Sequence, residues 1–353
     1  MSRGRRRRSL ARLVPGSSHR RGLRVISEAA GTLGPFEQYL RDVIEDAAHR
    51  EPLRSQLRHH FGLAEPERAR TGKRLRPRLV LAAARAFGAS DAVALPACAA
   101  VELLHNYSLI HDDIEDGDKL RHGRATVWSE FGLAHGVNCG DVVGALAYRS
   151  LEPVAELLGT DIAYAMTASL ARAHIAMCRG QALDLAGEGD ATATTSWYIE
   201  MIEGKTAALF ACSARLGALC ARASNEDVAR CAEVGRRFGL YFQIRDDIEG
   251  IWGETDRTGK TACADLGRRK KSFPVVWALE HAPAGAGAAI RKAYSRPGTG
   301  LDDRVVSALR AELEAAGARE AGVRAAAENA DAAREGARDI HALAEFVEAW
   351  SGR

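Results

Sequence analysis

Two acidic segments of almost the same sequence lie 134 residues apart in this chain, HDDIED at 111–116 and RDDIEG at 245–250. Each follows directly on an apolar run that is compatible with a helix, at 103–110 and at 238–244. Carboxylates next to apolar residues are costly in free energy unless a cation compensates them. The pair therefore predicts long helices that end in cation sites.

Mg²⁺ is the cation that such segments suit best. On a helix, Asp112 and Asp116 lie one turn apart on the same face. Clustered hard oxygen ligands are typical of Mg²⁺, which completes its coordination shell with the phosphates of a substrate. Two such clusters that face each other across a helical cavity would hold several Mg²⁺ ions around one diphosphate.

Composition favours helices over strands. The chain has 353 residues and 46% hydrophobic residues, enough for a sizeable core, but only 6% aromatic residues. Alanine is abundant and no segment shows convincing strand alternation. We therefore predict an all-α protein in which residues 31–353 form one domain behind a basic tail, residues 1–30.

Charge and cysteine usage narrow the class of protein. A net charge of +3 argues against a nucleic-acid partner. The seven cysteines form no CxxC pair and no zinc-ligand spacing, which indicates free thiols in a reducing compartment. No apolar run approaches the roughly 18 residues that span a bilayer. We expect a soluble, cytoplasmic protein.

The first 24 residues contain nine arginines and no acidic residue. Such a segment buries too little apolar surface to fold alone, so we interpret it as a disordered tail. Weak attraction to an anionic membrane surface and a targeting role are the alternatives.

Hydrophobic periodicity locates the helices. It predicts them at 35–58, 77–87, 93–111, 138–158, 161–186, 194–221, 225–250 and 272–282, with Ala-rich helices after residue 300. A polar connection is expected at 119–126, and a loop with at most one short helical turn is expected at 283–300.

A basic segment, GKRLRP at 72–77, precedes an apolar helix. Lys73 and Arg76 are three residues apart, so both can reach one anion, the lysine as a compact charge and the arginine as a planar fork. Taken alone, a basic segment of this kind is more often solvated surface.

The order of these segments resembles the polyprenyl synthase family of trans-isoprenyl diphosphate synthases. The matching motifs are GKxxRP at 72–77, DDxxD at 112–116, GQxxD at 180–184, GKT at 204–206, FQxxDD at 242–247 and TGK at 258–260. The resemblance implies the all-α isoprenoid synthase fold around a deep central cavity, and an enzyme that joins isopentenyl diphosphate to an allylic diphosphate.

The resemblance also implies roles for single residues. Lys73, Arg76 and His105 would bind the diphosphate of isopentenyl diphosphate. Mg²⁺, three ions in all, would be held by Asp112, Asp113, Asp116, Asp246 and Asp247. Arg121 would bind the allylic diphosphate, with Lys205, Thr206, Gln243 and Lys260 completing that site and facing the developing carbocation.

Three positions depart from the family pattern. His122 stands where a second arginine commonly contacts isopentenyl diphosphate, which puts this contact in doubt, and the nearby Arg124 is the alternative ligand. Gly250 replaces the third aspartate of the second acidic motif, which leaves two carboxylates there. Ala125 replaces a usual proline, a minor change.

Product length in this family depends on bulk before the first acidic motif. Tyr107 and Ser108 lie five and four residues before Asp112, and five residues rise about 7.5 Å along a helix. One aromatic with a small neighbour resembles the C20 pattern, so geranylgeranyl diphosphate is the expected product and farnesyl diphosphate the alternative. Tyr107 as an ordinary core residue is the other interpretation.

Two further alternatives keep the fold and change the activity. A terpene cyclase would not need Lys73, Arg76 and His105, and a non-catalytic partner subunit would not need intact aspartate pairs. The resemblance also suggests a homodimer, although an Ala-rich apolar face is equally compatible with intramolecular core.

Overall fold

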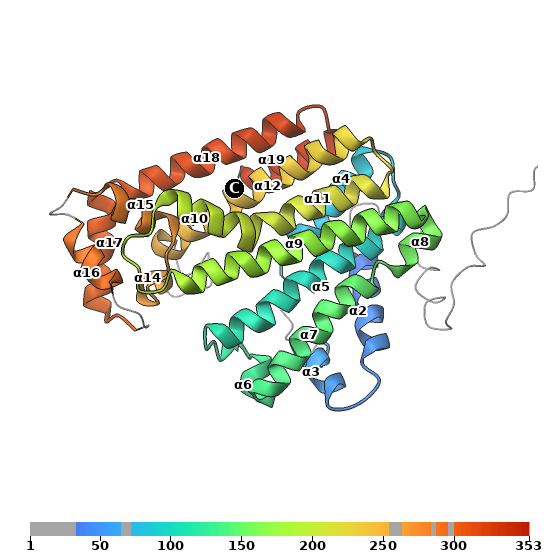
Figure 1. The fold of residues 1–353 in the computed structure, drawn as a ribbon, viewed down its shortest axis with the longest axis horizontal. Helices are drawn as coiled ribbons and strands as arrows, with labels where there is room; N and C mark the ends of the chain where they lie inside the picture. Colours follow the sequence, from blue (N-terminus) through green and yellow to red (C-terminus); the bar gives the residue numbers. More distant parts are fainter. Residues whose placement is uncertain (1–32, 65–71, 254–262, 284–286, 296–299, 353) are drawn as a thin grey trace, which may run out of the picture. The chain divides into compact units, whose positions relative to one another are not determined.

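The computed structural model describes residues 33–64, 72–253, 263–283, 287–295 and 300–352. The predictions for the basic tail, residues 1–30, and for Lys260 lie outside these residues. The described residues are almost entirely helical, which confirms the all-α class (Figure 1). They fall into two compact units, and the boundary between the units passes through two of the helices, α4 (Leu75–Ala86) and α9 (Thr160–Ala186).

The first unit comprises Met1–Pro77 and Ser90–Thr167. Its long helix α5 (Asp91–Glu115) packs against α2 and α7. Its other elements are α2 (Gly34–Ala47), α3 (Leu53–His60), β1 (Leu120–Arg121), β2 (Arg124–Ala125), α6 (Val127–Phe131), α7 (Leu133–Arg149) and α8 (Glu152–Leu158).

The second unit comprises Arg78–Ala89 and Ala168–Arg353. Its long helix α12 (Asn225–Trp252) packs against α11 (Ala208–Cys220) and α18 (Ala318–Ala337) (Figure 1). The remaining elements are α10 (Thr195–Ile202), η3 (Glu203–Ala207), α14 (Ala264–Gly267), α15 (Phe273–His281), α16 (Ala288–Tyr294), α17 (Asp303–Ala315) and α19 (His341–Ser351).

Local sequence accounts for the ends of these helices. The side chain of Ser224 accepts a hydrogen bond from the backbone N–H of Asp227 and caps α12. Asp302 caps α17 through the backbone N–H groups of Arg304 and Val305. Gly317, with φ 77°, separates α17 from α18 in the left-handed conformation that glycine adopts at little cost.

Three expected helices are divided in the structure. The helix expected at 35–58 is α2 followed by α3, and the helix expected at 138–158 is α7 followed by α8. The helix expected at 194–221 is interrupted by η3, a π-helical turn between α10 and α11. The polar connection at 119–126 contains a small antiparallel hairpin. This hairpin was not expected, because its two-residue strands are too short to show an alternating pattern.

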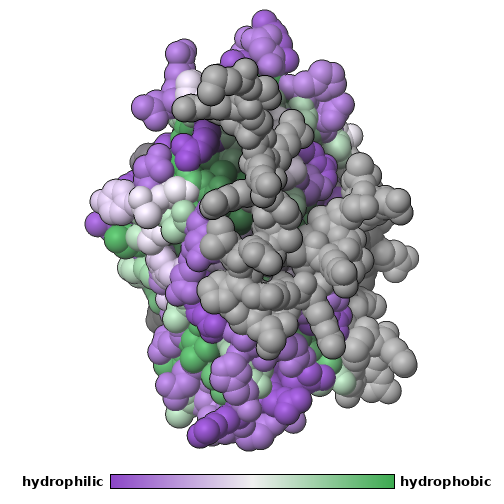
Figure 2. Space-filling model, turned by 90° about the vertical axis from the view of Figure 1, so that its right-hand side faces the viewer, coloured by the Kyte–Doolittle hydropathy of each residue, from purple (hydrophilic) through white to green (hydrophobic). Residues whose placement is uncertain are grey.

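Helix α5 corrects the expectation about membrane spans. Among the described residues, it is the one helix long and apolar enough to cross a membrane, with an 18-residue window of mean hydropathy 1.3. That window is 72% buried within the protein, as in the core helix of a folded domain. The surface visible in Figure 2, where it is not grey, carries mostly hydrophilic residues with small apolar patches.

Candidate functional site

The first acidic segment forms the C-terminal end of α5. Asp112 and Asp113 lie in its last turn and Asp116 is the C-cap residue. The C-terminal end of a helix is the negative end of its dipole, and the last turn of α5 has no basic residue that compensates it. Asp116 is exposed and Asp112 is partly exposed, whereas Asp113 is buried. Carboxylates placed in this way favour a bound cation.

Arg121 supplies one positive charge to this end of α5. It lies on β1, and its Nε donates a hydrogen bond to Oδ1 of Asp113 over 2.7 Å. Burial raises the pKa of the Asp113 carboxyl and the Arg121 guanidinium opposes this rise. The hairpin turns through His122 and Gly123, whose φ angles of 52° and 81° are those of a tight turn that matches the twist of its strands.

A cavity of about 130 Å³ lies beside this hairpin in the first unit. It is lined by three predicted diphosphate ligands, His105, Arg121 and His122. Burial lowers the pKa of His105 well below its usual value, and the guanidinium groups of Arg76, Arg121 and Arg74 lower it further. His105 is therefore a neutral hydrogen-bonding group among arginines, an environment suited to an anion.

The other predicted ligands of this anion lie on the GKRLRP segment. Burial lowers the pKa of Arg76 to about 10, and the nearby Glu102 carboxylate opposes that change. Lys73 is exposed at the start of the segment. Arg124, the substitute for His122, donates instead to the carbonyl oxygens of His59 (2.9 Å) and His60 (3.3 Å) at the end of α3.

A buried polar network anchors the GKRLRP segment. Arg74 has the left-handed φ of 51°, forms an ion pair with Glu102 and donates to Glu37 over 2.8 Å. The side chains of Arg74 and Glu102 are 11% and 6% exposed. Asn106 donates to the carbonyl oxygen of Glu102 over 2.8 Å. A strained backbone fixed by buried charges is a feature that clusters at functional sites.

The two residues predicted to control product length lie on α5. The ring of Tyr107 packs edge-to-face against His111, with centroids 4.6 Å apart. The hydroxyl of Ser108 donates to the carbonyl oxygen of His105 over 2.8 Å. Both side chains are partly buried.

In the second unit, two glycines bring α9 against η3. A Cβ on Gly180 would lie 2.7 Å from the carbonyl carbon of Gly204, and one on Gly204 would lie 2.6 Å from the carbonyl oxygen of Ala176. Only glycine permits this approach. It accounts for the glycines in the GQxxD and GKT motifs, and it fixes the turn that carries Lys205 and Thr206.

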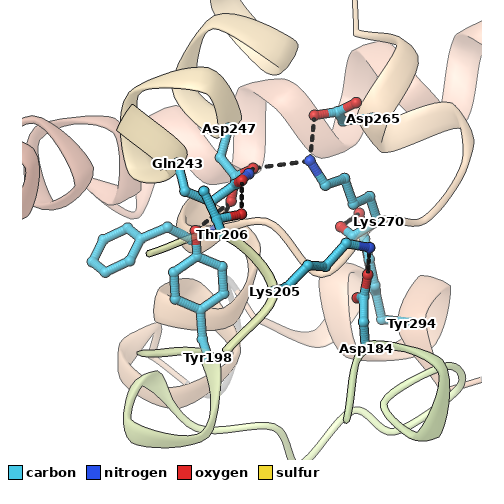
Figure 3. Close-up of polar contacts among 10 residues, drawn as sticks. Asp184, Tyr198, Lys205, Thr206, Gln243, Asp247, Asp265, Lys270 and Tyr294 are labelled. Atoms are coloured by element: carbon cyan, nitrogen blue, oxygen red, sulfur yellow. Dashed lines mark hydrogen bonds and ion pairs between the residues drawn. The ribbon is translucent and has the colours of Figure 1, made fainter. Parts of the chain in front are cut away.

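The side chains of this region form two groups of hydrogen bonds, one at Lys205 and one that runs from Thr206 to Asp247 (Figure 3). Lys205 donates to Oδ2 of Asp184 over 2.6 Å. Thr206 donates to Oε1 of Gln243 over 2.7 Å, and Nε2 of Gln243 donates to Oδ1 of Asp247 over 2.9 Å. The structure thus brings together four residues that the sequence placed in one site. Asp246, the neighbour of Asp247, is partly exposed.

Asp247 is 1% exposed, and each of its two carboxylate oxygens accepts two hydrogen bonds. Besides Gln243, Oδ1 accepts from Nζ of Lys270 over 2.9 Å. Oδ2 accepts from the hydroxyl of Tyr198 over 2.5 Å and from the backbone N–H of Phe273 over 2.9 Å. These donors fix the orientation of the second acidic segment.

Sequence reasoning missed Tyr198 and gave Lys270 no role. Lys270 belongs to a basic run at 268–271 that follows the second acidic segment, and the sequence does not show which of its residues faces that segment. Tyr198 follows Trp197 in the short helix α10 and belongs to no motif, so it gave no signal. Among the described residues, no group of three or more His, Cys, Asp or Glu side chains is arranged so that it could hold a metal ion.

Comparison with known proteins identifies similar sequences and folds. Residues 64–311 match the family model described as polyprenyl synthetase. The chain is 40% identical over 264 residues to the geranylgeranyl diphosphate synthase of Mycobacterium tuberculosis, covering 73% of each chain. It is 38% identical over 268 residues to the (2E,6E)-farnesyl diphosphate synthase of Mycobacterium bovis, covering 74% of this chain and 72% of that one.

Solved structures of similar proteins have the same fold as this chain. The polyprenyl synthetase of Streptomyces coelicolor matches with a TM-score of 0.80 and 33% identity, over 88% of this chain and 97% of that chain. The polyprenyl synthase of Caulobacter crescentus, complexed with calcium and isoprenyl diphosphate, matches with a TM-score of 0.77 and 27% identity, over 93% of this chain and 99% of that chain.

Proposed function

This chain belongs to the polyprenyl synthetase family and is a prenyltransferase, and on that premise we propose that it makes geranylgeranyl diphosphate. The reaction joins isopentenyl diphosphate to an allylic diphosphate. The observation that carries the proposed C20 length is the position of Tyr107, packed within the first unit five residues before Asp112.

Isopentenyl diphosphate binds at the cavity of the first unit in this proposal. Arg76 and Lys73 supply charge to its diphosphate, while neutral His105 donates a hydrogen bond. His122 lines the same cavity and is exposed, so it occupies a suitable position for a further contact. The buried network of Arg74 and Glu102 holds the loop in place before the substrate arrives, which lowers the entropic cost of binding.

Mg²⁺ fits the first acidic segment by the chemistry of its donors. Asp112, Asp113 and Asp116 offer only carboxylate oxygens, at a helix end whose dipole favours a cation. In the second unit, the partly exposed Asp246 offers the same donors, whereas Asp247 would have to exchange a hydrogen bond for an ion. We propose three ions in all, held by Asp246 and Asp247 together with the first segment. When bound, Mg²⁺ supplies positive charge that stabilises the departing diphosphate. The calcium and isoprenyl diphosphate of the Caulobacter crescentus protein support this proposal.

The residues proposed for the allylic substrate have separate tasks. Arg121 and Lys205, each held by a carboxylate in the structure, supply fixed charges to its diphosphate, and Lys260 supplies another. Thr206 and Gln243 direct their oxygen atoms toward the carbocation that forms when the allylic C–O bond breaks. The hydrogen bonds from Thr206 to Gln243 and from Gln243 to Asp247 orient these groups in advance.

Bond formation comes after ionisation of the allylic diphosphate. The double bond of isopentenyl diphosphate, held close by, attacks the allylic cation, and loss of a proton then restores an alkene. The released diphosphate is the candidate base, so no side chain is assigned that role. Apolar side chains must exclude water, which would otherwise convert the cation to an alcohol.

Product analysis tests this function. Purified protein is incubated with Mg²⁺, labelled isopentenyl diphosphate and, separately, the C5, C10 and C15 allylic diphosphates, and the dephosphorylated products are sized. Growth that ends at C20 is expected. Growth that ends at C15 would support the second candidate, farnesyl diphosphate, which the name of the Mycobacterium bovis relative favours. No incorporation from any starter would favour a cyclase-like enzyme or a partner subunit.

A homodimer is the proposed assembly. In the first unit, Leu133 and Val137 on α7, Leu157 on α8 and Tyr164 on α9 are large apolar side chains that are 59%, 41%, 46% and 77% exposed. A contiguous patch of such side chains would mark an interaction surface, and the proposal is that these residues contribute to one. Light scattering on the purified protein distinguishes a dimer from a monomer, and L133D together with Y164D should shift a dimer to monomer.

A further inference from the structure

Gly250 closes the second acidic segment at the position that Asp116 occupies in the first segment. The structure shows what fills the space. A Cβ on Gly250 would lie 2.7 Å from Cγ and 3.4 Å from Oδ1 of Asp265, and it would overlap Oδ2. Asp265 lies on α14 and is 8% exposed. Its carboxylate therefore stands directly against α12, where a side chain at position 250 would be.

Asp265 faces Lys270 (Figure 3). Oδ2 of Asp265 lies 3.5 Å from Nζ of Lys270, and the backbone N–H of Lys270 donates to the carbonyl oxygen of Asp265 over 2.9 Å. Nζ of Lys270 in turn donates to Oδ1 of Asp247 over 2.9 Å. Among the described residues, Oδ2 of Asp265 accepts no hydrogen bond, so the Lys270 ammonium is the cation that compensates its burial.

The charges of this group are interdependent. Burial would lower the pKa of Lys270, but the carboxylates of Asp247, Asp265 and Asp246 hold it well above its usual value. The ammonium is thus fixed between two buried carboxylates that come from helices α12 and α14. Without Asp265, one carboxylate would have to hold a lysine side chain that is 35% exposed.

We propose that Asp265 is a positioning residue of the second acidic segment: its carboxylate replaces the one that Gly250 lacks, and it fixes Lys270 against Asp247. The inference rests on the proposed function, because the segment that it orders is the proposed Mg²⁺ and allylic diphosphate site. Gly250 is then not a lost ligand but the condition for Asp265 to approach.

A double-mutant cycle of G250A and D265A tests this relationship. We expect each single variant to raise the Mg²⁺ concentration for half-maximal rate about tenfold, the lower end of the effect of removing a residue that orients metal ligands. G250A should add nothing in the D265A background, because its Cβ then meets no carboxylate. The KM for isopentenyl diphosphate should stay unchanged, since its proposed ligands lie in the first unit.

Two further variants separate the effects of charge and of the glycine change. D265N keeps the size of the side chain and removes its charge, so it should match D265A in Mg²⁺ dependence. G267A is the matched control, because a Cβ on Gly267 meets nothing within 4 Å. A D265N enzyme with the Mg²⁺ dependence of the wild type, or a G267A variant that shifts as far as G250A, would overturn the proposal.

The melting temperatures of the same variants, measured without substrate, test the contact independently of the reaction. G250A should lower the melting temperature when Asp265 is present and raise it in the D265A background, because alanine favours a helix more than glycine does. Equal shifts in both backgrounds would refute the contact even if the enzyme is active. A wild-type protein that makes no product would refute the proposed function, while this change of sign would still stand or fail by itself.

Discussion

The ring of Tyr107 lies directly against Gly144 of α7: a Cβ on that glycine would be 3.0 Å from Cδ2 of the tyrosine. The pair makes a close contact between α5 and α7 within the first unit. If this ring ends the growing chain, Y107A should give products longer than C20, and Y107F should keep the wild-type length because the ring remains. Product sizing tests both, and an unchanged spectrum for Y107A would assign Tyr107 to the core alone.

Removal of the first aspartate pair should abolish turnover. We expect D112N together with D113N to lower kcat by at least about 10²–10³-fold, the scale of losing charge stabilisation in a transition state. Steady-state rates measure the loss, and circular dichroism melting checks that the fold persists. Retained activity would exclude these residues from the Mg²⁺ site.

Replacement of His122 by arginine should strengthen the binding of isopentenyl diphosphate. H122R places a permanent charge at the exposed turn of the hairpin, beside the cavity that His105 and Arg121 line. We expect the KM for isopentenyl diphosphate to fall several-fold, while the KM for the allylic substrate remains the same. An unchanged KM for isopentenyl diphosphate would place position 122 outside its binding site.

Glu102 should support both stability and substrate binding. E102Q leaves Arg74, 11% exposed, without a charged partner on α5, and breaking a buried ion pair costs about 3 kcal/mol. Urea unfolding measures this loss. The KM for isopentenyl diphosphate should also rise, because Arg74 anchors the segment of Lys73 and Arg76. E37Q is the comparison, since the side chain of Glu37 is 34% exposed and its pair with Arg74 should contribute less.

Stability should decrease in acid because of His60. Burial lowers its pKa to about 3, although its hydrogen bond to Asn106 opposes that change. The unfolded chain therefore takes up a proton near pH 6.5 that the folded protein rejects, so stability present above pH 6.5 is lost as the pH falls toward 3. The slope from this one group is at most about 1.4 kcal/mol per pH unit. Urea unfolding between about pH 7.5 and pH 5 measures it, and H60Q should reduce the slope.

Long helices with strong local signals could be predicted from the sequence. The expected helix at 225–250 is α12, because an apolar pattern follows a serine cap. The expected helix at 93–111 extends to Glu115, since the acidic segment itself continues α5. Interruptions such as η3 could not be predicted, because a π-helical turn changes the pattern of backbone hydrogen bonds and no residue type is characteristic of it.

In the candidate site, too, some features could be predicted from the sequence and others could not. Thr206, Gln243 and Asp247 were named from motifs, and the structure connects them by hydrogen bonds. Contacts made across the fold were beyond the sequence. The approach of Asp265 to Gly250 depends on how α14 meets α12, and the two donors to Asp247 from Tyr198 and Phe273 come from separate helices.

The π-helical turn η3 has a consequence for engineering the enzyme. Deleting one residue within Glu203–Ala207 would merge α10 and α11 into a single regular α-helix, which has the more favourable backbone geometry. The deletion would also rotate α10 by about 100° relative to α11, the angle of one residue in an α-helix. Lys205 and Thr206 could not then both face Asp184 and Gln243. The same rotation would turn the buried side chains of Tyr198 and Met201 out of the core, so the deletion should lower stability as well as activity.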